Sequence, residues 1–355
     1  MLTAVVGINW GDEGKGRMVD LLSADYDIVC RYQGGNNAGH TVINDYGKIV
    51  LNLLPSGISR EGTVNVMGNG MVIDLEHLVH EIQSLRDKGI HIGPDNLKIS
   101  DKAVICLPWH KMQDIMEENR LKDKKFGSTR RGIGPVYADK YMKKAIRMGD
   151  LFAPDKLPEK VADLTEWKNL TVRGYGHEPV KAEDILAWLH EFGDPIKPYI
   201  TDVSDYLYDA ATAGENIMFE AQLGALRDIE FGIYPYTSSS CTLAGYATIG
   251  AGIPGLKLDK TIGIMKAYSS CVGEGPFTVE MFGDEAEALR RAGGEYGAAT
   301  GRPRRVGAFD IPASRYGVRM HGADCIALTK MDVLSYMEKI PVCVAYDING
   351  EITEK

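Results

Sequence analysis

Residues 11–16 read Gly-Asp-Glu-Gly-Lys-Gly, directly after the apolar run 5–8 and directly before a helix-like stretch at 17–22. A strand that turns through glycines into a helix can bind phosphate, because backbone N–H groups and the positive end of the helix dipole point at the anion. Lys15 adds a positive charge that can reach the outer phosphates. A glycine-rich turn with one lysine also occurs by chance, but the order of the elements favours a P-loop-like nucleotide site.

The loop differs from a standard P-loop in two ways. The spacing from Gly7 to Gly14 is longer, and Gly16 stands where a serine or threonine hydroxyl would bind Mg²⁺. The metal therefore needs another oxygen ligand. Asp12 lies inside the loop, where a carboxylate would repel phosphates unless it binds a metal or takes part in catalysis.

A second polar segment, residues 31–41, reads Arg-Tyr-Gln-Gly-Gly-Asn-Asn-Ala-Gly-His-Thr between two strand-like runs. Gln33, Asn36 and Asn37 can donate to and accept from a base edge, and the glycines allow close approach of the backbone to a ligand. His40 is a candidate acid or base. A single histidine is more often structural, but its place in this loop favours a functional role.

The pattern along the chain predicts an α/β fold: a central, mainly parallel sheet flanked by helices, with P-loop-like nucleotide-binding architecture. We expect one large α/β domain over residues 1–355, with an inserted, mainly helical region at 101–214. A hairpin is predicted from 41–44 and 49–53. The predicted strands are 3–8, 28–32, 64–67, 217–219, 261–265, 325–328 and 342–345, and the predicted helices are 75–86, 109–121 and 286–292.

Composition fits a cytoplasmic enzyme. The 355 residues are 44% hydrophobic, which is ample for a large core, and the sequence starts directly with a predicted strand rather than with a signal peptide. The net charge of −9 argues against nucleic acid as a partner, and no apolar run is long enough to span a membrane. Six scattered cysteines indicate reduced core residues rather than zinc ligands or disulfides.

A series of motifs in this order resembles the adenylosuccinate synthetase family. The resemblance covers essentially the whole sequence. The motifs that carry it are G-D-E-G-K-G (11–16), R-Y-Q-G-G-N-N-A-G-H-T (31–41), N-L-L-P-S-G (52–57), 67–70, G-S-T-R-R-G-I-G-P-V-Y-A-D-K (127–140), 219–222, 273–277, T-G-R-P-R-R (300–305) and T-K-M-D (329–332).

The resemblance implies GTP-dependent ligation of L-aspartate to IMP through a 6-phosphoryl-IMP intermediate, in AMP biosynthesis. It assigns Asp12 as the base that removes the N1 proton of IMP, with His40, Lys15 and Gln222 as further catalytic residues. The cofactor is Mg²⁺, with Asp12 and the Gly39 carbonyl as ligands, consistent with the missing hydroxyl at position 16.

The resemblance also assigns the substrates. GTP is assigned to Gly11, Glu13, Gly14, Lys15, Gly16, Gly39, His40, Thr41, Arg304, Lys330 and Asp332. IMP is assigned to Asp12, Asn37, Ser128, Thr129, Lys143, Gln222, Thr237, Ser238 and Arg302. Aspartate is assigned to Ala299, Thr300, Gly301, Arg302 and Arg304.

Two of these assignments also follow from residue chemistry. Arginine forks match carboxylates and phosphates, although an arginine cluster at 302–305 could equally be a solvated surface. Asp332 follows an apolar run and can accept hydrogen bonds from guanine N1–H and N2–H₂, which favours GTP over ATP. A four-residue match of this kind is more often a plain helix N-cap, so the assignment depends on the other motifs.

The position of Lys143 is assigned to the IMP phosphate of the partner subunit, so a homodimer is expected. The family usually has arginine there, and lysine keeps the charge without the bidentate fork, which predicts weaker IMP binding. Lys143 and Lys144 are expected on a short helix, where a plain solvated face is the alternative.

The family usually continues for several dozen residues past position 355 with a further guanine-contacting motif. Its absence from this sequence predicts weaker guanine binding. Two other functions stay open at this stage: a GTP-binding switch or binding module, and a phage-type ligase that uses dGMP. Asp12 argues against the phage-type ligase, since those relatives tend to lack the loop aspartate.

Overall fold

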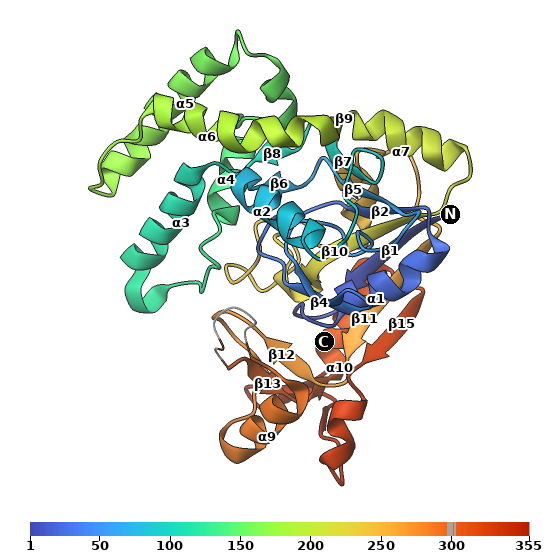
Figure 1. The fold of residues 1–355 in the computed structure, drawn as a ribbon. Coiled ribbons are helices and arrows are strands. Elements are labelled where there is room, and N and C mark those ends of the chain that lie inside the picture. The colour runs from blue at the N-terminus through green and yellow to red at the C-terminus, as the bar shows by residue number, and fades with distance from the viewer. Residues whose placement is uncertain (297–300, 302, 355) are drawn as a thin grey trace.

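A computed structural model describes residues 1–296, 301 and 303–354. Its centre is an eight-stranded sheet in the order β15-β11-β1-β10-β2-β5-β7-β9, in which every neighbouring pair is parallel. The predicted parallel sheet and flanking helices are confirmed (Figure 1). The strands are β1 (Leu2–Gly7), β2 (Ile28–Arg31), β5 (Val64–Met67), β7 (Leu97–Ser100), β9 (Ile200–Thr201), β10 (Ile217–Gly224), β11 (Lys260–Lys266) and β15 (Cys325–Thr329).

Helices cover this sheet on both faces, so nearly all residues of its middle strands β1, β10 and β2 are buried. The α-helices are α1 (Lys15–Leu22), α2 (Leu75–Arg86), α3 (Pro108–Leu121), α4 (Ile133–Tyr141), α5 (Leu157–Gly174), α6 (Ala182–Gly193), α7 (Val203–Thr212), α8 (Ala247–Ala251), α9 (Gly283–Gly293) and α10 (Ile311–His321). Short 3₁₀ segments are η1 (Ser23–Asp25), η2 (Lys122–Lys124), η3 (Met148–Phe152), η4 (Asp194–Tyr199), η5 (Ala225–Arg227), η6 (Ala244–Tyr246) and η7 (Asp332–Tyr336).

Alternation along the strands decides which helix packs on which face. In β1, Val5 belongs to a cluster with Val19 of α1, whereas Ala4 and Val6 belong to a cluster with α7 and α8. Successive side chains of a strand point to opposite faces, so one apolar run supplies both layers. Helices therefore pack against both faces of β1 before it leads into the loop 8–14.

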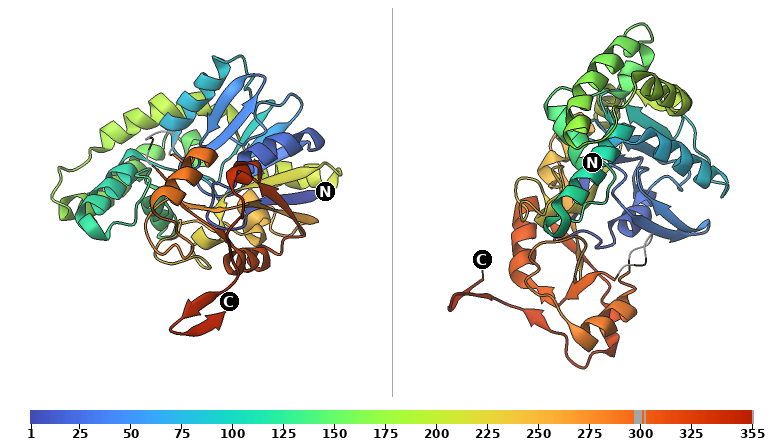
Figure 2. Two further views of the ribbon diagram at one scale, coloured as in Figure 1. Left: turned by 90° about the horizontal axis from the view of Figure 1, so that it is seen from below. Right: turned by 90° about the vertical axis from the view of Figure 1, so that its left-hand side faces the viewer.

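Short strand pairs surround the central sheet. They are β3 (His40–Asn44) with β4 (Gly47–Leu51), β6 (Val72–Ile73) with β8 (Val104–Ile105), β12 (Ser269–Cys271) with β13 (Arg305–Gly307), β14 (Phe309–Asp310) with β16 (Val342–Cys343), and β17 (Tyr346–Ile348) with β18 (Glu351–Thr353). The β17–β18 hairpin projects from the body in both views of Figure 2. The β3–β4 pair is the predicted hairpin, which is confirmed.

The region 101–214 contains α3 to α7, and in Figure 1 α3, α5 and α6 lie on the opposite side of the sheet from α9. Two-residue strands interrupt the helices: β8 pairs with β6 and β9 pairs with β7. The boundaries of an inserted region stay a prediction.

Three local predictions were wrong. Strand 342–345 shrinks to Val342–Cys343 and pairs with β14 rather than with the central sheet. Lys143 and Lys144 lie past the end of α4, because the backbone turns to φ 62° at Lys143 and leaves the helix. Not all cysteines are core residues, since Cys325 is exposed and Cys241 and Cys343 are half-buried.

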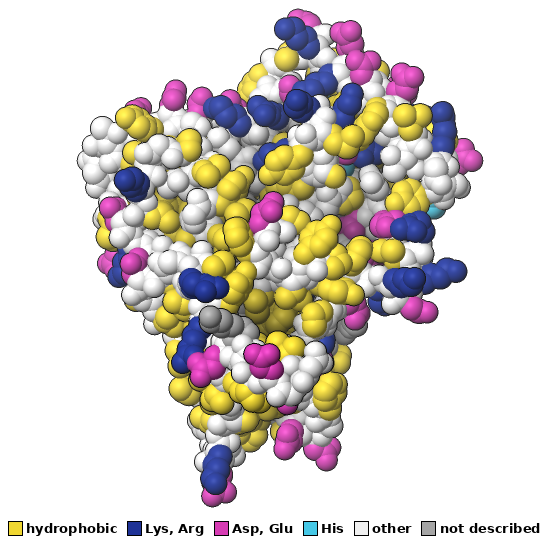
Figure 3. Space-filling model, turned by 180° about the vertical axis from the view of Figure 1, so that it is seen from behind, with side chains coloured by type: hydrophobic (Ala, Val, Ile, Leu, Met, Phe, Trp, Pro, Cys, Tyr) yellow, Lys and Arg dark blue, Asp and Glu magenta, His cyan; other side chains and the backbone are white. Residues whose placement is uncertain are grey.

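In the described part of the chain, no helix combines the length and apolar character needed to cross a membrane. On the face shown in Figure 3, several basic side chains lie close together across the upper part of the molecule, while acidic side chains are scattered over the same face.

Candidate active site

The loop after β1 is folded around the side chain of Glu13. Its Oε1 accepts hydrogen bonds from the backbone N–H groups of Asn9 (3.2 Å) and Gly11 (2.8 Å), and its Oε2 lies 2.6 Å from Lys15 Nζ. Both Glu13 and Lys15 are buried. The predicted strand–loop–helix is confirmed, with α1 beginning at Lys15, so the N–H groups of the first turn face the loop.

Asp12, by contrast, is exposed and has a left-handed backbone, with φ 57°. A residue other than glycine in this conformation costs of order 1 kcal/mol, and such strain is concentrated at functional sites. Asp12 Oδ2 lies 3.4 Å from Arg304 Nη2, which joins the loop to the C-terminal half of the chain.

Position 16 has no room for a side chain, because the loop 33–40 packs directly against α1 there. A Cβ at position 16 would lie 2.6 Å from the Cβ of His40 and 3.1 Å from Ser56 Oγ. The contact therefore excludes the serine or threonine of a standard P-loop. It also brings the two predicted site segments together.

Glu220 of β10 fixes the imidazole of His40. Its Oε1 lies 2.5 Å from His40 Nδ1, and its two oxygens accept the hydroxyl (2.5 Å) and the backbone N–H (2.8 Å) of Ser56. Burial alone raises the pKa of a carboxyl, but the charge and hydrogen bond of His40, the Arg31 charge and the Ser56 hydroxyl together lower the pKa of Glu220. Because Glu220 engages Nδ1, Nε2 is the nitrogen left to act on a substrate.

Buried polar groups shape the loop 31–37. Arg31 donates to Gln222 Oε1 (2.8 Å) and to the carbonyls of Asn52 and Gly35, while Gln33 Nε2 donates to the Gln222 carbonyl (2.7 Å). Gln222 is buried and its Oε1 is already engaged, which leaves its Nε2 as the free group. The loop N–H of Gly35 donates to Asn37 Oδ1 at 3.2 Å.

The T-K-M-D segment lies against the same loop. Thr329 Oγ1 donates to the Glu13 carbonyl at 2.6 Å, and a Cβ at Gly14 would contact Thr329. Lys330 Nζ donates to the Gly293 carbonyl at 3.0 Å. Asp332 is exposed at the start of η7 and does not cap an α-helix.

The polar turn predicted for IMP is anchored by an acid of α3. Asp114 accepts from the Ser128 hydroxyl (2.6 Å) and the Gly132 N–H (2.9 Å), so Ser128 is engaged while Thr129 is exposed. Tyr137 of α4 links the turn to the loop 33–40, since its hydroxyl accepts from the Gly34 N–H at 2.9 Å. Lys143 is exposed beyond α4.

The hydroxyl run 237–240 reaches the same neighbourhood through one contact. Ser240 Oγ donates to Gln33 Oε1 at 2.9 Å and lies 3.2 Å from Ser238 Oγ. Thr237 and Ser238 are half-buried. Ala299, Thr300 and Arg302, which were assigned to aspartate or IMP, lie outside the described residues, and Gly301 has φ 64°.

Some buried polar atoms here have no partner among the described residues. They include Asn36 Oδ1, Gln222 Nε2 and Arg304 Nε. A buried polar group without a hydrogen bond is costly, so these three atoms are candidates for hydrogen bonds to a ligand.

Sequence reasoning assigned no role to Glu220, Ser56, Glu295 or Lys266. Glu220 stands between Phe219 and Ala221 in a strand that is otherwise apolar over 217–221. An acidic residue in such a run is the signal that was available, because buried carboxylates are nearly always paired. The other three give no comparable local signal.

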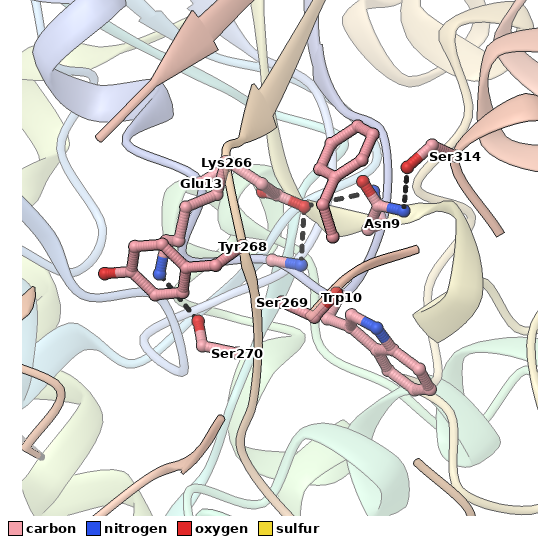
Figure 4. A pocket seen from close by; sticks show the side chains of 10 residues that line it. Asn9, Trp10, Glu13, Lys266, Tyr268, Ser269, Ser270 and Ser314 are labelled. Atoms are coloured by element: carbon pink, nitrogen blue, oxygen red, sulfur yellow. Dashed lines mark hydrogen bonds between the residues drawn. The ribbon is translucent and has the colours of Figure 1, made fainter. Parts of the chain in front are cut away.

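A small cavity lies directly behind the loop (Figure 4). It is lined by Asn9, Glu13, Lys266 and Ser270, among others, and the Lys266 Nζ donates to Ser270 Oγ at 2.6 Å. The cavity therefore lies between the loop and residues of β11 and β12.

Comparison with known proteins identifies relatives of this chain. The adenylosuccinate synthetase family model matches residues 4–355. The chain is 45% identical to the adenylosuccinate synthetase of Caldanaerobacter subterraneus over 99% of its length and 83% of the relative's, and 44% identical to that of Ligilactobacillus salivarius over 98% and 80%.

Two solved structures are similar. One is the fully ligated adenylosuccinate synthetase of Plasmodium falciparum, with a TM-score of 0.90 and 38% identity over 99% of this chain and 82% of that one. The other, a cyanophage S-2L succinoaminodeoxyadenylate synthetase bound to dGMP and dATP, has a TM-score of 0.64 and 19% identity over 99% and 93%, which shows a shared fold alone. The dGMP-using ligase and the GTP-binding switch are therefore not favoured. The chain belongs to the adenylosuccinate synthetase family.

Proposed function

We propose that Asp12 is the catalytic base of this enzyme, that His40 and Lys15 stabilise the transferred phosphoryl group, and that the Asp12 carboxylate and the Gly39 carbonyl would hold Mg²⁺. The family's reaction is GTP-dependent ligation of L-aspartate to IMP, which forms a C–N bond and yields adenylosuccinate, GDP and phosphate in AMP synthesis.

In the first step, Asp12 takes the N1 proton of IMP, and O6 attacks the γ-phosphorus of GTP. The O6–P bond forms as the bond from the γ-phosphorus to the β,γ-bridging oxygen breaks and GDP leaves. His40 Nε2 donates to a phosphoryl oxygen, while Lys15 and the N-terminus of α1 neutralise the phosphates. Lys15 is held for this task by Glu13, at 2.6 Å.

In the second step, the neutral aspartate amine attacks C6 and gives up one proton, and the C6–O6 bond breaks so that O6 and that proton leave as inorganic phosphate. Arg304 faces the carboxylates of aspartate in this proposal, because a guanidinium fork matches a carboxylate. Gln222 directs its free Nε2 toward the purine. Thr129, Thr237, Ser238 and Asn37 contact IMP, and Lys330 and Asp332 contact guanine.

The residues fit a magnesium ion. Asp12 supplies an exposed carboxylate, and Gly39 is exposed with open space where a Cβ would be. Mg²⁺ prefers such oxygens, and it would offset the negative charge of GTP. The hydroxyl ligand of a standard P-loop is excluded by the Gly16–His40 contact.

The observation that carries the proposal is the contrast between adjacent acids of one loop. Glu13 is buried and bonded to three groups of the loop, whereas Asp12 is exposed in a strained conformation. Of these two carboxylates, only that of Asp12 is exposed and able to reach a substrate.

The test is the variant Asp12→Asn, whose ligation rate is measured from the absorbance change that accompanies formation of adenylosuccinate. We expect kcat to fall by about 10²–10⁴, the usual contribution of a general base. Asp45→Asn, in the exposed turn between β3 and β4, is the matched control and should keep wild-type activity. An unchanged kcat in Asp12→Asn would refute the role of base.

A further inference from the structure

Arg304 lies between two carboxylates of very different exposure. Its Nη1 is 3.0 Å from Glu295 Oε2, and its Nη2 is 3.4 Å from Asp12 Oδ2. The Glu295 side chain is 2% exposed, whereas that of Asp12 is 36% exposed. Exposed ion pairs are weak and readily exchanged, whereas a buried charge that loses its partner is strongly destabilised. Asp12 is therefore the exchangeable partner of Arg304 and Glu295 the permanent one.

Glu295 is itself fixed from the sheet side. Its Oε1 accepts from Lys266 Nζ of β11 at 2.8 Å and from the Tyr268 hydroxyl at 2.5 Å. Burial raises the pKa of a carboxyl, but Lys266, Tyr268 and Arg304 together lower the pKa of Glu295. Lys266 is held in turn by Ser270 Oγ, at 2.6 Å. Charges thus alternate from Lys266 to Glu295, Arg304 and Asp12.

The backbones of Glu295 and Arg304 are also joined. The Arg304 N–H donates to the Glu295 carbonyl at 2.9 Å, and Tyr296 and Pro303 form an antiparallel bridge one residue further on. Arg290 Nε of α9 donates to the Arg304 carbonyl at 2.8 Å. The main chain of Arg304 is therefore fixed, and Glu295 determines where its guanidinium points.

We infer that Glu295 is a positioning residue: supported by Lys266 and Tyr268, it directs the guanidinium of Arg304 toward the reaction centre. When Asp12 exchanges its contact with Arg304 for a contact with substrate, Glu295 keeps the guanidinium in place. The inference rests on the proposed role of Arg304. Arg304 Nε, buried and without a partner among the described residues, is a donor that this orientation leaves available.

The kinetic test is a double-mutant cycle of Glu295→Gln and Arg304→Ala. Glu295→Gln keeps the shape of the side chain but removes its charge, so we expect kcat/KM for aspartate to fall about 10- to 100-fold. Because the buried Lys266 loses its counter-charge, we also expect a lower Tm, and kinetics are therefore measured well below the unfolding temperature of the variant. If Glu295 acts through Arg304, the double variant loses no more than Arg304→Ala alone. Losses that multiply, or a wild-type kcat/KM in Glu295→Gln, would overturn the inference.

A chemical test does not depend on turnover. Phenylglyoxal modifies arginines, and mass spectrometry reports the rate at each position in the full chain. We expect Arg304 to react several-fold faster in Glu295→Gln than in wild type. Glu280→Gln is the matched control, because Glu280 pairs with the next residue, Arg305, at 2.5 and 2.8 Å. It should accelerate Arg305 and leave Arg304 unchanged.

The two measurements separate the possible failures. Wild-type protein that forms no adenylosuccinate would contradict the proposed function, and the phenylglyoxal rates would still decide the role of Glu295. An unaltered rate at Arg304 in Glu295→Gln would overturn the inference even in a fully active enzyme.

Discussion

Glu220 and His40, 180 residues apart in the sequence, form a 2.5 Å contact between a carboxylate oxygen and Nδ1 at β10, a middle strand of the central sheet. The carboxylate is fully buried and also accepts two hydrogen bonds from Ser56. This is the arrangement by which an acid selects one tautomer of an imidazole and orients its ring.

We therefore expect Glu220→Gln to lower kcat by about 10²-fold, because the amide cannot balance the charge of a protonated His40. Steady-state ligation at saturating IMP, GTP and aspartate measures the change. Glu230→Gln, an exposed carboxylate in the loop after β10, should behave as wild type. Wild-type kcat in Glu220→Gln would mean that His40 does not depend on this carboxylate.

Gly16 carries the second prediction. A methyl group there would lie 2.6 Å from the His40 Cβ, so Gly16→Ala should push the loop 33–40 away from α1 and lower kcat/KM for GTP by about tenfold or more. Gly16→Ser should also be impaired, although it restores the hydroxyl of a standard P-loop. Gly174→Ala in α5, where the added Cβ meets open space, is the control. Improved activity in Gly16→Ser would contradict this steric account.

The third prediction concerns acid stability. His321 is buried, with Nε2 donating to the Gly7 carbonyl at 2.9 Å and Nδ1 accepting from the Ala244 N–H at 3.2 Å. Burial lowers the pKa of His321 to about 4, against 6.5 for an ordinary histidine. Below about pH 6.5, His321 therefore binds a proton in the unfolded chain, whereas in the native state it binds one only near pH 4 and below.

Stability must accordingly fall as the pH drops through this window, by about 2 kcal/mol at pH 5 from this group. For a chain of this size that corresponds to about 3 °C in Tm. Thermal unfolding is measured at pH 7 and pH 5 for both proteins. From pH 7 to pH 5, the Tm of the wild type should fall about 3 °C further than the Tm of His321→Gln, whose side chain does not titrate. Equal decreases in both proteins would exclude His321 as the cause.

The parts of the site that were predicted are those specified by neighbouring residues. The turn from β1 into α1 needs glycines and a lysine within six positions, and all of them can be read from residues 11–16. The same holds for the hairpin of β3 and β4, whose alternation and turn lie within twelve residues. Their mutual contact at Gly16 and His40 was not predicted, because packing of two loops depends on the whole sheet.

Pairings across the chain were missed for the same reason. Glu295 meets Lys266 and Arg304 only because β11 and the strand pair β12–β13 bring them together. The end of α4 was misjudged because a lysine at φ 62° gives no sign in sequence, where glycine would mark such a position. Long-range ion pairs and unusual backbone conformations therefore account for most of what the motifs did not show.

Lys143 carries the last prediction. It is exposed beyond the end of α4, as a residue that completes a partner's site in a symmetric dimer should be. Asp12→Asn and Lys143→Ala should each impair ligation at low IMP, yet a mixture of the two proteins should recover about a quarter of wild-type activity, since random exchange makes half the dimers hybrid and each hybrid has one intact site. Mixing Asp12→Asn with Lys15→Ala, two changes in one loop, should recover nothing if Lys15 acts in its own subunit. No recovery with Lys143→Ala would place Lys143 outside the partner's site.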